Sequence, residues 1–303
     1  MTKTIELNEI RKFGNLELLA RQLVEGFITG LHKSPYHGFS VEFAEHKLYN
    51  QGESIRNIDW KLYARTDRMY VKRFEEETNL RAVVLLDISG SMYYPKETSG
   101  KLTFSIMACA ALLYLLHRQR DAFGLTTFSD EIISSFDPKS STLQLKTIFS
   151  HLENLLSSGP VFKKSSVTQT IHTIADKIHK RSLVILFTDM FDNTENSNDI
   201  FNALQHLKHN KHEVILFHVR DKKTEELFEF EDHPYRFIDL ESNEELRIQT
   251  HQVKNEYVQL MNEFTKSLKI KSAQYQIDYI DADIQEGYEQ ILLPYLVKRT
   301  KLG

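Results

Sequence analysis

Residues 81–92, RAVVLLDISGSM, show the pattern from which the fold class is predicted. An unbroken apolar run ends in Asp87, and Ser89 and Ser91 follow it at alternate positions. An apolar run without polar alternation is typical of a strand whose two faces are both covered by other elements. The stretch therefore predicts a buried strand that ends in a row of side chains bearing oxygen atoms.

Strand and helix patterns alternate along the chain after residue 80. Strands are predicted at 81–88, 121–129, 182–189 and 213–219, with a hairpin strand at 131–136, and helices at 102–120, 141–156, 168–180 and 197–211. The pattern continues with a strand at 236–240, a helix around 248–269, a strand at 274–280 and a helix near 286–299. This order predicts an α/β fold: a Rossmann-like, mainly parallel sheet covered by helices on both faces.

The first 80 residues have a different character. An amphipathic helix is predicted around 15–31, and the residues after it are rich in aromatic and charged side chains with glycine and proline turns. We therefore expect residues 1–80 to form a small N-terminal appendage, a helix with a β-rich part. Residues 81–303 are expected to form the α/β domain with a C-terminal extension.

Composition narrows the class of protein. The 38 basic and 42 acidic residues leave a net charge of −4, which argues against nucleic acid as the main partner. Cys109 is the one cysteine in the sequence, so no internal disulfide can form and a reducing compartment is expected. The longest apolar stretch, residues 104–116, is shorter than the ~20 residues that a membrane span needs, and it predicts a buried helix. Because the N-terminus has no apolar signal region, we expect a cytoplasmic protein without direct membrane insertion.

Asp87 and Asp189 each stand at the end of an apolar run that predicts a strand. In open α/β sheets the carboxyl ends of the strands face the ligand crevice, so both carboxylates are expected to face one crevice. A structural role remains open, in which Asp87 caps the next helix and Ser89 and Ser91 make turn hydrogen bonds. A phosphate-binding loop is rejected, because the nearest match, GKL at 100–102, has no serine or threonine after the lysine.

A magnesium-dependent phosphatase or hydrolase also remains open. In that mechanism Asp87 would be the nucleophile and Asp189 would hold Mg²⁺. Such enzymes usually need a second acidic residue two positions after the nucleophile, where this chain has Ser89, and a lysine would also be expected. Because of these two departures, the phosphatase or hydrolase is the second hypothesis.

A metal site fits the row of oxygens best. Side chains two residues apart in an extended loop point the same way, so Asp87, Ser89 and Ser91 can converge on one ion. Ligand atoms that are all oxygen suit a hard cation such as Mg²⁺, Mn²⁺ or Ca²⁺. Asp87 and Asp189 would balance a divalent charge, and an open coordination position would accept a carboxylate from a partner. A scaffold that binds no metal is the third hypothesis.

The pattern D-x-S-x-S after the first strand, with an aspartate after a later strand, resembles the metal-ion-dependent adhesion site of von Willebrand factor A-like domains. DISGS supplies the first three ligands of such a site, and FTD supplies the last. The family places a threonine in a loop between them; here Ser165 stands at that place, and Thr168, three residues later, is the alternative. The ligands of Mg²⁺ or Mn²⁺ that the resemblance implies are Asp87, Ser89, Ser91, Ser165 and Asp189.

Residues 53–77, ESIRNIDWKLYARTDRMYVKRFEEE, run into this strand and resemble the bacterial family labelled domain of unknown function 58. The marks of that family are R-x-I-D-W, the A-R-T that follows it and V-K-x-F-E-E-E. Members are typically encoded beside an AAA ATPase of the MoxR type and are thought to work with it as chaperone-like or adaptor components. Their biochemical activity is not established.

The resemblance implies a non-catalytic, divalent-metal-dependent module for protein–protein interaction. The expected partner supplies an acidic residue and is a MoxR-type AAA ATPase or its client. The family signature outside the metal loop either locks the appendage to the α/β core or forms a docking surface. Its residues are Arg56, Asp59, Trp60, Arg65, Lys72 and Arg73.

Overall fold

The structure is a computed structural model. It describes residues 15–32, 46–48, 60–72, 80–95, 98, 100–157, 167–190, 197–209, 211–231, 233–238 and 245–302. Its contacts divide the chain into two units, one of Met1–Gly26 with Leu80–Gly303 and one of Phe27–Asn79.

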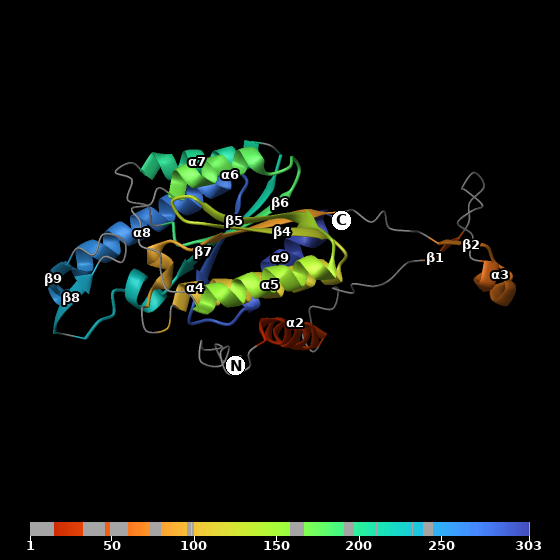
Figure 1. The fold of residues 1–303 in the computed structure, drawn as a ribbon, viewed down its shortest axis with the longest axis horizontal. Coiled ribbons are helices and arrows are strands. Elements are labelled where there is room, and N and C mark those ends of the chain that lie inside the picture. The colour runs from red at the N-terminus through yellow and green to blue at the C-terminus, as the bar shows by residue number, and fades with distance from the viewer. Residues whose placement is uncertain are drawn as a thin grey trace. The chain divides into compact units, whose positions relative to one another are not determined.

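A six-stranded sheet forms the centre of the larger unit (Figure 1). Its strands lie in the order β10-β7-β6-β3-β4-β5, and every neighbouring pair is parallel except β4 with β5. The strands are β3 (Arg81–Asp87), β4 (Ala122–Phe128), β5 (Ile132–Lys139), β6 (Leu183–Thr188), β7 (Glu213–Arg220) and β10 (Asp278–Asp283). The predicted mainly parallel sheet is confirmed.

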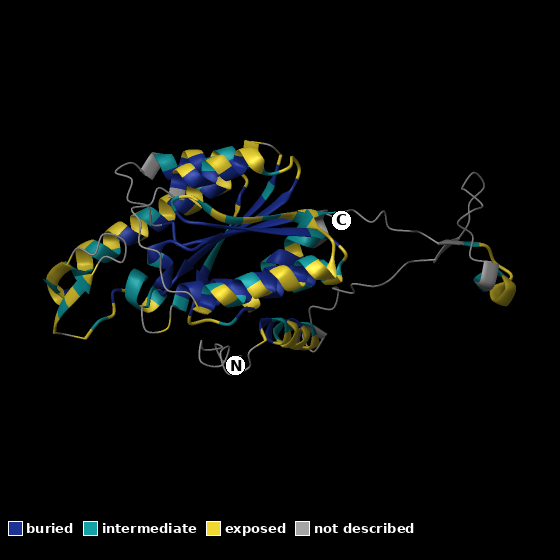
Figure 2. Cartoon of the chain, viewed as in Figure 1, coloured by how far each residue is buried: buried dark blue, intermediate teal, exposed yellow. Residues whose placement is uncertain are grey.

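Helices cover both faces of this sheet. One face carries α4 (Gly100–Arg118), α5 (Thr142–Ser157) and α9 (Glu289–Leu302), and the other carries α6 (Val167–Lys177), α7 (Ser197–His209) and α8 (Thr250–Gln274). The central strands are accordingly buried along most of their length (Figure 2). This double cover is the reason that their sequences are apolar without alternation.

Helix α5 shows how a local pattern fixes an element and its orientation. Ser141 accepts a hydrogen bond from the backbone N of Gln144 at 3.1 Å, which caps the start of the helix. Leu145, Ile148 and Leu152, spaced three or four residues apart, are all buried. The apolar stripe therefore packs inward, and polar residues between these positions remain outside.

Helix α4 contains the apolar stretch that we predicted as a buried helix, and the structure confirms it. By length and composition α4 could cross a membrane, with a mean hydropathy of 1.4, but 83% of that apolar window is buried inside the protein. Cys109 lies in its middle and is fully buried. The apolar surface of α4 thus serves the core between the sheet and its neighbouring helices.

The C-terminal part departs from the predicted pattern. The strand expected at 236–240 is β8 (Pro234–Ile238), which pairs antiparallel with β9 (Glu245–Gln249) in a separate two-stranded sheet. Part of β9 was predicted as the beginning of a helix. Many residues of this hairpin are exposed, so its sequence lacks the apolar run that marks strands of the main sheet.

The following elements are displaced toward the C-terminus relative to their predicted ranges. Helix α8 continues to Gln274, and Gln276 adopts a left-handed backbone conformation with φ of 57°. The last strand, β10, therefore occupies 278–283 instead of 274–280. Its pairing with β7 brings Asp281 opposite His218.

The N-terminal prediction needs a correction. We expected residues 1–80 to form one appendage, but the described residues 15–26 group with the α/β unit. The backbone N of Leu16, at the start of α2 (Leu16–His32), donates to Glu153 Oε1 of α5 at 2.8 Å, and Leu16 is fully buried. The unit of residues 27–79 contains α3 (Trp60–Thr66) and the antiparallel strands β1 (His46–Leu48) and β2 (Tyr70–Lys72).

Gly124 in β4 provides a test of the packing between β4 and β5. A Cβ atom at this position would overlap the carbonyl oxygen of Phe136 in β5, beside a shift in the strand register. We expect Gly124→Ala to lower the free energy of unfolding by roughly 1–3 kcal/mol, measured by urea denaturation, because the two backbones cannot separate without losing hydrogen bonds.

Gly26→Ala is the matched control. A Cβ at Gly26 in α2 would have no heavy atom within 4 Å. Alanine favours the helix by about 0.5–1 kcal/mol over glycine, so this variant should be at least as stable as the parent. A Gly124→Ala variant as stable as Gly26→Ala would contradict the close approach of β4 and β5.

Candidate functional site

The loop after β3 gathers three of the predicted ligands. Asp87 is the last residue of β3, and its Oδ1 accepts a hydrogen bond from the backbone N of Ser89 at 2.9 Å. Ser91 lies in the short helix η2 (Gly90–Tyr93), and its hydroxyl is 3.2 Å from that of Ser89. The backbone N of Ile88 donates to the carbonyl of Phe128 in β4 at 2.8 Å. The loop is therefore held to the sheet, with its hydroxyls close together.

Asp189 follows β6, the strand that pairs parallel with β3. Leu86 and Phe187 are paired in the register, so both strands end at the same edge of the sheet. Thr188 Oγ1 donates to Asp87 Oδ2 at 2.6 Å and accepts from the backbone N of Met190 at 3.0 Å. The sequence analysis assigned no role to Thr188. Its position directly before the predicted ligand Asp189 was the one feature that could have indicated a role in the site.

The two carboxylates lie away from water. Asp87 and Asp189 have no exposed surface, and Ser89 is 1% exposed. Burial, the largest cause, and the charge of Asp189 together raise the pKa of Asp87 to about 7, and the hydrogen bonds from Thr188 and Ser89 oppose this shift. Asp87 consequently changes its protonation state in the neutral range.

Lys101 also contacts this site, although the sequence analysis assigned it no role there. The residue stands in the first turn of α4, and its side chain is 1% exposed. Its Nζ donates to Asp189 Oδ2 at 2.8 Å and to Glu225 Oε1 at 2.5 Å. Burial favours the neutral amine, but the charges of Asp189 and Glu225 raise the pKa of Lys101 above its ordinary value. The side chain is thus a buried ammonium ion.

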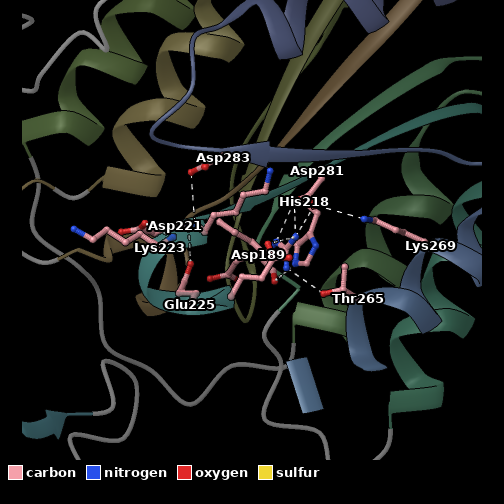
Figure 3. A network of polar contacts seen from close by, with 12 residues as sticks. Asp189, His218, Asp221, Lys223, Glu225, Thr265, Lys269, Asp281 and Asp283 are labelled. Atoms are coloured by element: carbon pink, nitrogen blue, oxygen red, sulfur yellow. Dashed lines mark hydrogen bonds and ion pairs between the residues drawn. The ribbon is translucent and has the colours of Figure 1, made fainter. Parts of the chain in front are cut away.

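Glu225 comes from η3 (Lys222–Glu226), a single π-helical turn after β7. Its Oε2 accepts a hydrogen bond from the backbone N of Asp221 at 2.8 Å, which orients the carboxylate. Burial raises its pKa, although Lys101 opposes that shift. Figure 3 shows Glu225 and Asp189 within one network of polar contacts.

The network continues from Asp189 to the C-terminal strand. His218 Nε2 lies 2.9 Å from the backbone O of Asp189, and Nδ1 lies 2.7 Å from the hydroxyl of Tyr279. Burial lowers the pKa of His218 to about 3, so the ring is neutral at pH 7. Because a carbonyl can only accept, Nε2 carries the proton and Nδ1 accepts from Tyr279. Asp281, beside His218 in Figure 3, forms a bidentate pair with Arg220, at 2.6 Å to each carboxylate oxygen.

The other predicted residues are only partly covered by the structure. Thr168 is buried in the first turn of α6, and Ser165 lies outside the described residues. Of the predicted docking residues, Arg65 is exposed on α3, Trp60 begins that helix and Lys72 ends β2. The ones outside the described residues are Arg56, Asp59 and Arg73.

The donor chemistry fits a hard divalent cation. Two carboxylates, two hydroxyls and no nitrogen or sulfur ligand are what Mg²⁺ or Mn²⁺ prefers. With Asp87 ionised, the three carboxylates of Asp87, Asp189 and Glu225 and the ammonium of Lys101 carry a net charge of two negative units, which one divalent ion would neutralise. Among the described residues no three His, Cys, Asp or Glu side chains are grouped to hold a metal, so the hydroxyls of Ser89 and Ser91 would be needed as ligands.

Comparison with known sequences matches most of this chain to one protein family. The family model described as "Protein of unknown function DUF58" matches residues 45–267. Uncharacterized proteins of Mycobacterium bovis and Mycobacterium tuberculosis are 29% identical over 100 residues. That match covers 33% of this chain and 32% of each relative. The chain thus matches about a third of the length of these curated relatives.

Solved structures of low sequence identity are also similar. The conserved hypothetical protein BatB of Bacteroides thetaiotaomicron is 12% identical, with a TM-score of 0.44, over 74% of this chain and 100% of that one. An aerotolerance-related membrane protein of Bacteroides fragilis is 13% identical, with a TM-score of 0.44, over 73% and 99%. Manganese-loaded TRAP protein of Plasmodium vivax is 19% identical, with a TM-score of 0.37, over 46% and 57%.

The raised pKa of Asp87 predicts a pH dependence of stability without metal. Between pH 4 and pH 7 the folded state keeps a proton on Asp87 that the unfolded state releases, so the free energy of unfolding falls as pH rises. Asp87→Asn removes this titration. In urea denaturation with a chelator, the variant should gain roughly 2 kcal/mol over the parent between pH 5 and pH 8.

Asp121 has a pKa raised by burial to about 6 and contributes its own pH dependence. Because that group is present in both proteins, the difference between parent and Asp87→Asn cancels it. Parallel stability profiles of the two proteins would show that Asp87 titrates at its ordinary pKa.

Proposed function

The chain belongs to the DUF58 family of proteins of unknown function, and we propose that it is a non-catalytic module for protein–protein interaction whose binding depends on a divalent ion. One observation carries the proposal. Asp87 and Asp189 are buried at adjacent ends of parallel strands, beside two hydroxyls 3.2 Å apart. Such a donor set suits a hard cation and leaves the ion with few charged ligands.

The side chains that would hold the ion come from the loops after β3 and β6, together with either Ser165 or a residue of the first turn of α6. Mg²⁺ or Mn²⁺ is the proposed ion, and when bound it would supply an electrophilic centre for one further carboxylate. Its proposed ligands are Asp87, Ser89, Ser91, Asp189 and either Ser165 or Thr168.

The proposed partner is a protein that offers an acidic residue, and a MoxR-type AAA ATPase or its client is the candidate. The support is the family resemblance, together with a net charge of −4, which does not favour nucleic acid. We also propose that this interaction takes place in the cytoplasm, without direct membrane insertion, and the support is the single cysteine, Cys109, and the burial of the apolar helix α4 inside the protein. Ser91 is partly exposed whereas Asp87 and Asp189 are buried, so a partner would approach from the side of Ser91.

A metal-dependent phosphatase remains the second candidate because Lys101 supplies the lysine that such a mechanism expects. Two features disfavour it. Asp87 is fully buried, and both of its oxygens accept hydrogen bonds, from Ser89 and Thr188, which weakens it as a nucleophile. Turnover of a generic phosphate ester with Mg²⁺, lost in Asp87→Asn, would favour this candidate over the interaction module.

Titration calorimetry with Mn²⁺ and Mg²⁺ tests the proposed ion. Asp87→Ala should lower the affinity by at least about tenfold, because it removes one of two buried charges that would face the ion. Asp121→Asn is the matched control: Asp121 is also a buried carboxylate, but it pairs with Arg299. Equal affinities in the parent and Asp87→Ala would contradict the site.

The dependence of partner binding on the ion needs a separate measurement. The purified chain, the Asp87→Ala variant and the Asp121→Asn control are each tested for binding to a purified MoxR-type AAA ATPase, with Mg²⁺ and with chelator. We expect binding to fall only for Asp87→Ala and in chelator. If Asp87→Ala binds the ATPase as tightly as the parent does, the ion is not the contact.

A further inference from the structure

Lys101 occupies a position where a lysine is unfavourable unless its charge is paired. It is the second residue of α4, and the N-terminal end of a helix carries partial positive charge. Its ammonium is also removed from water, which is unfavourable for any unpaired charge. Local helix formation therefore disfavours this residue, and its carboxylate partners compensate.

The start of α4 holds this lysine in place. The backbone N of Lys101 donates to the carbonyl of Tyr94 at 3.0 Å. A Cβ on Gly100 would lie 2.9 Å from Pro95 Cδ, so only glycine fits this close approach at the start of the helix. The ammonium also lies 5.7 Å from the centre of the Tyr94 ring. Backbone and ring together direct the side chain toward Asp189.

We propose that Lys101 is the resident cation of the site and competes with a divalent ion for Asp189, so that this lysine sets the affinity for the ion. The inference rests on the proposed metal site and adds a residue that opposes it. Asp189 Oδ2, at 2.8 Å from Nζ, is the oxygen for which the two cations compete. A divalent ion at this carboxylate would repel the ammonium across a short distance in a medium of low polarity.

Glu225 gives the displaced ammonium somewhere to remain. Its Oε1 already lies 2.5 Å from Nζ, and it belongs to η3 rather than to the loops that carry the proposed ligands. Rotation of the lysine side chain can release Asp189 while the contact with Glu225 persists. The exchange of cations therefore needs no unfolding of α4, and it links the state of the site to the position of η3.

Titration of Mn²⁺ into the parent and into Lys101→Met tests the competition. Methionine keeps most of the volume of the side chain and removes its charge. We expect Lys101→Met to bind Mn²⁺ about tenfold more tightly or better, within the range of ordinary coupling between sites. Lys298→Met is the matched control, because Lys298 is also paired with two carboxylates, Glu213 and Asp278, outside the site, and its affinity should equal that of the parent.

The outcomes separate this inference from the proposed function. If the parent binds Mn²⁺ and Lys101→Met binds it equally or more weakly, competition by Lys101 is wrong and the metal site stands. If neither protein binds Mn²⁺, the metal site itself is wrong and the inference falls with it. Binding by Lys101→Met alone would support both.

A second measurement uses the parent protein and does not depend on the folding of a variant. The Nζ–H resonance of a buried, ion-paired lysine can be followed by NMR in the ¹⁵N-labelled chain. Saturation with Mg²⁺ should shift the resonance of Lys101 and leave that of Lys298 in place. An unchanged Lys101 resonance at saturation would overturn the proposal.

Discussion

The parallel hydrogen bonding of β3 with β6 determines where charge gathers in this protein. Each strand is apolar along its length and is followed at its end by polar residues, and the register brings these ends together. Because helices cover both faces of the sheet, Asp87 and Asp189 meet where water is excluded. Two like charges in such a place require donors and a cation. Thr188, the backbone of Ser89 and the ammonium of Lys101 provide them.

The same burial distinguishes this site from a carboxylate pair on an open surface. Ser91 is the partly exposed member of the DISGS loop, and the carboxylates lie beneath it. Lys101 and Glu225 extend the site toward η3, a segment far from the DISGS loop in sequence. In this site the ammonium of Lys101 already offsets part of the negative charge of the carboxylates. A cation that binds there from solution therefore has to compete with that ammonium. This is the physical basis for treating Lys101 as part of the site.

The C-terminal elements β10 and α8 hold the residues next to the site in place. His218 connects the backbone of Asp189 to Tyr279 of β10, and Arg220 joins Asp281 on the same strand. Arg220 also donates to Thr265 of α8 at 3.0 Å. Side chains of β10 thus orient His218 and Arg220 of β7 and, through His218, the backbone of Asp189 after β6. The site and the C-terminal elements belong to one packing unit for this reason.

The sequence was enough to predict the main sheet, most of the helices that cover it and the residues of the DISGS loop. It could do so because apolar runs and helical periodicity report burial locally, and because carboxyl ends of parallel strands meet at one edge. The strand β8 was predicted, but its partner β9 was missed, since the exposed residues of β9 lack such a run. The contacts of Lys101 with Asp189 and Glu225, which lie 88 and 124 residues away, are apparent only in the folded structure. Pairing of buried charges depends on which distant elements pack together, and no local pattern carries that information.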